Sequence, residues 1–195
     1  MTRELFTRRL LTRRLVTFGA LAGGVSLLGG CGFQPIYMPT ASGKPGPSRR
    51  ELATVFVRII PDRPGQLLRL ALQDDFASDS GIPPQYDLAV TYSIAGEAIG
   101  IESTAIATRI RFIGNASWSL LAHDVKSSRL TGGNARYMDG INNFDGQYFA
   151  SDLETEAVQQ RMATEIAQQI TTQLAIWFRQ QADKQASREA DARAG

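Results

Sequence analysis

The chain has 195 residues, 43% hydrophobic and 21% charged, a composition that excludes a disordered chain and favours one folded domain. The formal net charge is +2, but residues 1–30 hold five arginines and one glutamate, so the rest of the chain, with 16 basic and 18 acidic residues, carries −2. This balance gives no reason to expect nucleic-acid binding. The single cysteine excludes an intramolecular disulfide.

The first 30 residues have the pattern of a signal peptide. Arginines precede an uncharged apolar stretch, residues 15–28, which is shorter than the roughly 20 residues that span a bilayer. The stretch ends in Leu28-Gly29-Gly30-Cys31, which resembles the lipobox of bacterial lipoproteins. The resemblance implies cleavage between Gly30 and Cys31, S-diacylglycerol on the Cys31 thiol and an N-acyl chain such as palmitate on its amino group. Such lipid would anchor the protein stably.

Two features bear on export and destination. Thr12-Arg13-Arg14-Leu15-Val16 loosely resembles a twin-arginine motif, although we favour the general secretory route because arginines are common in any signal peptide. Gly32 follows the cysteine where an aspartate would, in lipoproteins generally, favour retention in the inner membrane. We therefore expect a lipid-anchored protein on the periplasmic side of the outer membrane.

Residues 31–50 are predicted to form a lipidated extended tether, because three prolines and two glycines lie between 39 and 50. A single domain follows over 51–180. The tail, 181–195, has almost no large apolar residue and is expected to be disordered.

The domain begins with a strand and a helix. Valine and isoleucine recur over 55–60, which predicts a strand, and leucines at i, i+4 over 66–76 predict a helix, with Pro64 in its first turn. Gly81 and two prolines after it end this helix. Strict alternation over 86–94 predicts a second strand.

Two further strands and a long helix follow. From 104 to 120 the apolar side chains take even positions and the polar ones odd positions, which predicts a strand with one dry face. A fourth strand is predicted over 129–144, with a bulge or bend at Gly132-Gly133. Ser151 and Glu154 have capping-box spacing, and a helix should run from there to about Arg179.

The order β-α-β-β-β-α predicts an α+β, two-layer sandwich in which two helices pack on one face of a mainly antiparallel, four-stranded sheet. A chain of about 165 residues buries roughly 68% of its unfolded surface, which is sufficient for such a core. The last helix carries an apolar stripe from Met162 to Trp177. The stripe could hold acyl chains, but core packing is the favoured interpretation.

No catalytic constellation is present, and we predict that the protein is not an enzyme. His123 is the only histidine and lies in a predicted, solvated turn, so neither a triad nor a zinc site is expected, nor any cofactor beyond the covalent lipid. Several acidic residues could be paired carboxylates, but helix surfaces explain them: Asp74, Asp75, Asp152, Glu154 and Glu156. The glycine-rich stretches at 96–100, 132–133 and 139–140 lack phosphate-loop spacing.

Arg109 and Arg111 are the candidate binding residues. They lie two positions apart on one predicted strand, so both guanidinium groups should project from the same face and could clamp a phosphate or sugar acid. An ordinary solvated sheet face is the alternative.

Several segments together resemble the LPS-assembly lipoprotein family, LptE. The similarity spans most of residues 31–178 and rests on these stretches: Cys31-Gly32-Phe33-Gln34-Pro35-Ile36-Tyr37, Arg63-Pro64-Gly65-Gln66 with the leucines of 67–72, Tyr86-Asp87-Leu88-Ala89-Val90, and Tyr148-Phe149-Ala150 through Glu156-Ala157 with the helix after them. The resemblance implies a lipoprotein that lies inside the outer-membrane barrel LptD, aids assembly of the barrel and binds lipopolysaccharide on its way to the cell surface.

Within this interpretation Arg109 and Arg111 would meet lipid A phosphates. Two alternatives remain. One is a structural or assembly lipoprotein unrelated to lipopolysaccharide. The other is a periplasmic enzyme or solute receptor, which should have a convergent polar pocket.

Overall fold

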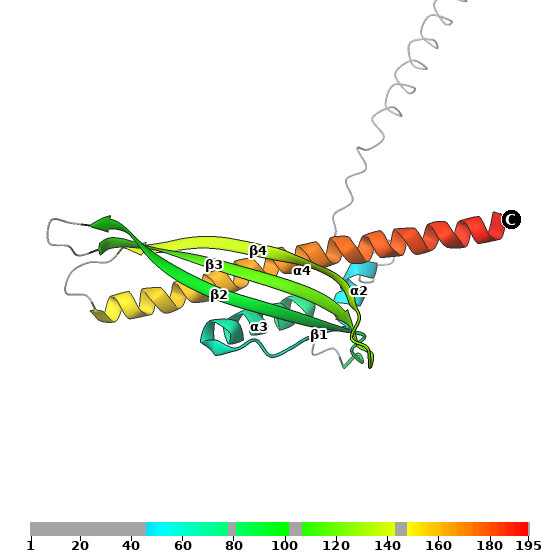
Figure 1. The fold of residues 1–195 in the computed structure, drawn as a ribbon, viewed down its shortest axis with the longest axis horizontal. Helices are drawn as coiled ribbons and strands as arrows, with labels where there is room; N and C mark the ends of the chain where they lie inside the picture. Colours follow the sequence, from blue (N-terminus) through cyan, green and yellow to red (C-terminus); the bar gives the residue numbers. More distant parts are fainter. Residues whose placement is uncertain (1–45, 78–80, 102–106, 143–147, 195) are drawn as a thin grey trace, which may run out of the picture. The chain divides into compact units, whose positions relative to one another are not determined.

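The computed structural model describes residues 46–77, 81–101, 107–142 and 148–194. Its elements are α2 (Pro47–Leu52), β1 (Val55–Val57), α3 (Asp62–Phe76), β2 (Tyr86–Ile101), β3 (Ala107–Ala122), β4 (Arg129–Asn142) and α4 (Tyr148–Ala194). Figure 1 shows α3 and α4 on the same side of the four-stranded sheet. The predicted α+β class and two-layer architecture are confirmed.

The strands lie side by side in sequence order, β1-β2-β3-β4. The β2–β3 and β3–β4 pairs are antiparallel, as predicted for most of the sheet, whereas β1 pairs with β2 in parallel. The parallel pair follows from α3, which carries the chain back across the sheet between the two strands.

One face of the sheet is apolar because the side chains alternate along each strand. Leu88 lies opposite Leu120, and Val90 lies opposite Trp118, and all four are buried. The helix α4 packs over these residues with Ile166, Ile170 and Leu174, while Met162 packs in a second cluster with Ile141. None of these four α4 side chains retains any exposed surface. The apolar stripe is therefore core, as the sequence favoured.

Gly114 lets α4 approach the sheet. A Cβ atom at this position would lie 2.8 Å from Cε of Met162 and 3.0 Å from Cδ1 of Ile166. The strand β3 thus has no side chain at the point where the helix crosses it, and the two layers meet there in direct contact.

The N-terminal boundary of the domain lies earlier than predicted. Residues 47–50 were expected within an extended tether, but they form most of α2, with Pro47 at the first helical position. Ser48 and Leu52 are buried, so this short helix belongs to the core. The segment contains only one large apolar residue, and therefore no periodicity that could have indicated a helix.

The C-terminal helix is longer than predicted at both ends. It begins at Tyr148, so Ser151 lies inside the helix and is not the N-cap. Nothing in Tyr148-Phe149-Ala150 breaks a helix, which is why the local capping signal did not set the boundary. The expected disorder over 181–195 is also wrong for residues up to Ala194, which continue α4 because alanine, glutamine and charged residues favour helix without burial.

Three smaller boundaries differ from the prediction. β1 ends at Val57, after which Ile59 is exposed and Ile60 turns into the core. α3 starts at Asp62 and ends before Ala77, whose left-handed backbone stops the helix ahead of Gly81. β2 continues beyond residue 94 to Ile101. Residues 143–144, the predicted end of the fourth strand, and 104–106, the predicted start of the third, lie outside the described residues.

The predicted bulge in β4 lies beside the two glycines. Gly132 and Gly133 pair regularly with Ser119 and Trp118, and the register shifts at Leu130, between Arg129 and Thr131. Gly133 is needed for a different reason, because a Cβ there would lie 2.7 Å from Oε1 of Gln173 in α4.

Candidate functional site: the outer face of the sheet

The outer face, defined here as the sheet surface turned away from α3 and α4, carries both candidate arginines. Arg109 and Arg111 are exposed and occupy alternate positions on β3, so they project from this same face as predicted. Their surroundings differ. Nη2 of Arg111 lies 2.7 Å from Oε2 of Glu97, its neighbour in register on β2. Arg109 lies between Gly100 and Asn142 and has no ion pair within the described part of the chain.

A shallow hollow of about 470 Å³ crosses the other half of the outer face. Small and polar side chains from β2, β3 and β4 line it, including those of Ala89, Thr91, Ser117, Ser119 and Asn134. Arg129 reaches over Gly132 at its rim, so closely that a Cβ on the glycine would clash with the guanidinium group. Hydroxyl, amide and guanidinium groups can all hydrogen-bond to a sugar or an anion.

Two arginines of the outer face were not found by sequence reasoning. Arg136 lies opposite Asn115 on β4, and Arg129 pairs with Leu121. Both are exposed, and neither has an ion pair among the described residues. Weak alternation in β4 hid their orientation, which becomes apparent only with the register of β3. Together with Arg109 and Arg111 they make the outer face basic. Two acids of β2 share this face, Glu97, which is paired with Arg111, and Asp87, which is paired with Arg58.

His123 is not simply solvated in its turn. Its ring Nδ1 lies 2.9 Å from Oδ1 of Asp87, and Nη2 of Arg58 lies 3.0 Å from Oδ2 of the same carboxylate. Burial acts to raise the pKa of Asp87, but the hydrogen bonds and charges of Arg58 and His123 outweigh it and lower this pKa below the usual value. No hydroxyl or thiol hydrogen-bonds to the His123 ring in the described chain, so this cluster lacks a nucleophile.

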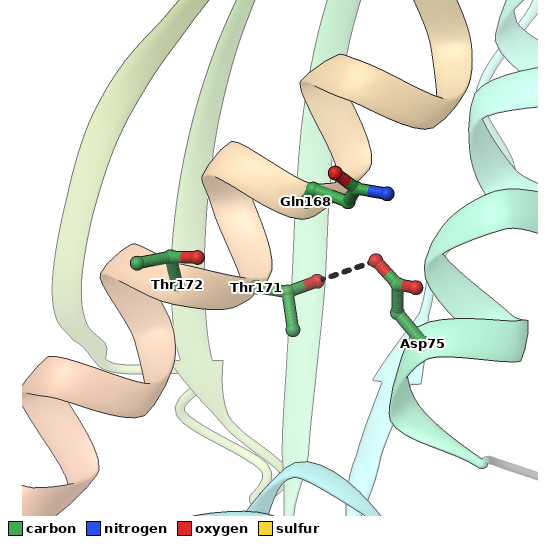
Figure 2. A pocket seen from close by; sticks show the side chains of 4 residues that line it. All are labelled: Asp75, Gln168, Thr171 and Thr172. Atoms are coloured by element: carbon green, nitrogen blue, oxygen red, sulfur yellow. Dashed lines mark hydrogen bonds between the residues drawn. The ribbon is translucent and has the colours of Figure 1, made fainter. Parts of the chain in front are cut away.

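A second small pocket, of about 300 Å³, lies between α3 and α4 (Figure 2). In Figure 2, Asp75 points from α3 toward Thr171 of α4, and their side-chain oxygens are 3.1 Å apart. Thr171 also contacts the carbonyl of Ala167 at 2.8 Å, although its hydroxyl has one hydrogen for these two acceptors. Burial raises the pKa of Asp75, the charge of Asp74 adds to this, and the Thr171 hydrogen bond opposes it.

The remaining acidic candidates do not form a catalytic pair. Asp152 and Glu154 are exposed on the first turns of α4, and Glu156 forms an ion pair with Arg63. In the described part of the chain no three potential ligands lie close enough to hold a metal. Within the same residues no helix is both long and apolar enough to cross a bilayer. Gly30 and Cys31 lie outside the described residues.

Comparison with known proteins gives the family. A sequence profile of the family described as LptE, lipopolysaccharide-assembly, matches residues 52–174. No curated protein matches significantly.

Solved structures share the fold. One is a candidate lipoprotein from Caulobacter crescentus CB15, 24% identical, with a TM-score of 0.54 and coverage of 67% of this chain and 95% of that chain. Another is a minor lipoprotein from Acinetobacter baumannii, 13% identical, with a TM-score of 0.50 and coverage of 64% and 92%. Because the profile matches more than half of the residues of this chain, the chain belongs to the LptE family of lipopolysaccharide-assembly lipoproteins.

Proposed function

We propose that this protein is an outer-membrane lipoprotein that partners the LptD β-barrel, aids assembly of that barrel and helps to deliver lipopolysaccharide to the cell surface. The observation that carries the proposal is the family match over residues 52–174. The outer face supports it, because three of its four arginines, Arg109, Arg129 and Arg136, have no ion pair among the described residues and suit an anionic glycolipid.

Membrane attachment through Cys31 is part of the proposal. Leu28-Gly29-Gly30-Cys31 supports cleavage after Gly30 and lipidation of the cysteine, and Gly32 supports export to the outer membrane. Helix α2 begins at Pro47, so a chain segment that reaches at most about 58 Å would separate the lipid from the domain. Each acyl methylene contributes roughly 0.8 kcal/mol to anchoring. Mass spectrometry of the N-terminal peptide and a Cys31→Ser variant test this point.

We propose Arg109 and Arg111 as lipopolysaccharide contacts. Guanidinium groups bind phosphate through paired, charge-assisted hydrogen bonds. Arg109 has no acidic partner among the described residues, whereas Arg111 would have to exchange Glu97 for the ligand, so Arg109 should contribute more. The two positions could therefore be ranked by measuring Arg109→Ala and Arg111→Ala separately.

The double variant Arg109→Ala/Arg111→Ala should bind lipopolysaccharide roughly tenfold more weakly, as loss of one charged hydrogen bond predicts. Arg188→Ala, on an exposed part of α4, is the matched control. Unchanged affinity of the double variant would oppose the assignment of these residues and leave the family role standing.

Partnership with the barrel is tested by purification of C-terminally tagged protein from outer membranes in mild detergent. A stoichiometric large β-barrel protein is the expected companion. Recovery of the lipidated chain alone, or with an unrelated partner, would favour a structural lipoprotein outside lipopolysaccharide transport. We propose no enzymatic role, in keeping with the character of the family.

A further inference from the structure

The outer edge of β4 is closed by side chains. This strand is the last of the sheet, and a last strand normally presents unpaired N–H and C=O groups to which another chain can add a strand. In this protein, α4 runs beside β4, and two of its glutamines contact the backbone of that edge.

Gln169 pairs with Arg136 as a strand residue would. Its Nε2 donates to the Arg136 carbonyl at 3.2 Å, and the Arg136 N–H donates to its Oε1 at 3.3 Å. A carboxamide carries the same donor and acceptor as a peptide group, so Gln169 reproduces both hydrogen bonds of a neighbouring strand.

Gln173 repeats the contact two residues along β4. Its Nε2 donates to the carbonyl of Asn134 at 3.0 Å, while Nε1 of Trp118 donates to its Oε1 at 3.0 Å and fixes the amide orientation. The spacing explains why two glutamines suffice, because four residues of helix rise about 6.0 Å and two residues of strand advance about 6.7 Å. The two periods match closely enough for consecutive contacts.

Asp139 closes the next part of the edge. Its Oδ1 accepts the N–H of Gly140 at 2.7 Å, and Nη2 of Arg161 holds its Oδ2 at 2.8 Å. Because outward backbone groups recur at every second residue, Met138 is the one position between Asn134 and Gly140 whose outward groups have no such partner among the described residues. A single open residue is too short for a strand ladder.

We propose that Gln169 and Gln173, with the Arg161–Asp139 pair, act as a surrogate fifth strand that prevents a second copy of this chain from pairing along β4. The opposite edge supports this interpretation. β1 has only three residues, and Nε of Arg69 donates to the carbonyl of Val57 at 3.3 Å. Both edges thus carry such contacts, on β4 over the stretch Asn134–Gly140 and on β1 at Val57.

The test uses the full chain, purified in mild detergent and separated from any β-barrel companion before measurement. Gln169→Ala/Gln173→Ala should form a dimer whose population rises with concentration in native mass spectrometry, while the parent chain stays monomeric. Gln181→Ala/Gln185→Ala is the matched control, because it removes two glutamines at the same spacing on the same helix, one half-buried and one exposed, beyond the part of α4 that contacts β4 in these hydrogen bonds. The control should stay monomeric.

Hydrogen exchange locates the contact. In dilute Gln169→Ala the Arg136 amide should exchange roughly fivefold faster than in the parent, as loss of one hydrogen bond predicts. In the dimer the amides of Arg136 and Met138 should become protected. A folded variant that stays monomeric at every concentration overturns the proposal, even if its Arg136 amide exchanges faster.

Gln173 also accepts a hydrogen bond from Trp118, so its loss could unfold the double variant. The single variant Gln169→Glu, which leaves Gln173 in place, then tests the proposal. A carboxylate accepts from the Arg136 N–H but cannot donate to its carbonyl, so this single variant should associate more weakly than Gln169→Ala and more strongly than the parent. Equal monomer content in the parent and both single variants would overturn the surrogate-strand role.

Discussion

The side chains of His123 and Asp87, 36 residues apart, meet where the β3–β4 turn folds against the start of β2, with Nδ1 of the ring 2.9 Å from Oδ1 of the carboxylate. The backbone joins the same two segments, since the His123 N–H donates to the carbonyl of Gln85 at 2.9 Å. Arg58 approaches the other carboxylate oxygen from just beyond β1. One buried carboxylate therefore ties β1, β2 and the β3–β4 turn together.

Asp87→Asn should lower the free energy of unfolding by about 1–2 kcal/mol at neutral pH, a modest loss because both partners, Arg58 and His123, are half exposed. The folded state lowers the pKa of Asp87, so its contribution is present above the ordinary value of 3.8 and is lost as the pH falls through the folded-state value below that. Urea unfolding at several pH values checks this. The parent should be more stable than the variant at both pH 7 and pH 5, and a difference that vanished by pH 5 would contradict the assignment.

Tyr92→Phe should leave stability unchanged or raise it by up to about 1 kcal/mol. The Tyr92 hydroxyl is buried without a hydrogen-bond partner among the described residues, and burial raises its pKa to about 12. Tyr86→Phe is the control, since that hydroxyl donates to Glu51 at 3.4 Å and its removal should not stabilise. A clear loss of stability in Tyr92→Phe by thermal unfolding would reveal a partner that the structure does not contain.

Asp75→Asn should raise stability at pH 7 by less than about 1 kcal/mol, because Asp75 is partly exposed. Burial raises the pKa of Asp75, so the protonated form is favoured on folding and stability is lost as pH rises through the folded-state pKa. The Asn amide can donate to Thr171 while Thr171 donates to Ala167. The gain in stability should disappear below the ordinary pKa of 3.8. Chemical denaturation at acidic and neutral pH measures it. A gain of the same size at both pH values would contradict the prediction.

Ile170→Ala should cost about 2–5 kcal/mol, because the side chain has 0% of its surface exposed and truncation leaves a cavity between α4 and the sheet. Ile176→Ala on the same helix is the matched control, with 41% exposure and an expected change within about 0.5 kcal/mol. Urea unfolding measures the loss of stability in both variants. Equal losses would contradict the position of Ile170 in the core.

Truncation after Ala182 should change the free energy of unfolding by less than about 0.5 kcal/mol, since residues 183–193 are all exposed on α4. Truncation after Ile176 should be far more damaging. It also removes Phe178, which is buried and lies with its ring centroid 5.2 Å from that of Tyr86. Circular dichroism on heating separates these outcomes.

The sequence predicted those elements whose burial is periodic. The stripe Met162–Leu174 and the alternation of Leu88 and Val90 are local signals, and both were confirmed. The helix α2 was missed because its burial depends on Leu52 and a serine, which form no period. The end of α4 was misjudged because exposure was equated with disorder, although alanine and an i, i+4 pair, Glu189–Arg193, favour helix in water.

At the candidate site, too, the local pattern predicted only part of what the structure shows. Alternation placed Arg109 and Arg111 on one face, but the pairing of Arg111 with Glu97 needs the β2–β3 register, which no local pattern contains. Arg129 and Arg136 join that face only through the register of β4. Contacts between residues far apart in sequence therefore decide which arginines lack an acidic partner.

The contact between α3 and α4 also has a consequence for the order of folding. The strands β2, β3 and β4 follow one another with short connections, so their pairing needs only neighbouring parts of the chain. Asp75 and Thr171, which meet between the helices, are 96 residues apart. On a chain that emerges N-terminus first, the sheet can form while its apolar face is still uncovered, and α4 arrives last. Before α4 docks, the β4 edge and the apolar face of the sheet are both uncovered, and the chain is then most prone to aggregation. A chaperone would act mainly in this interval.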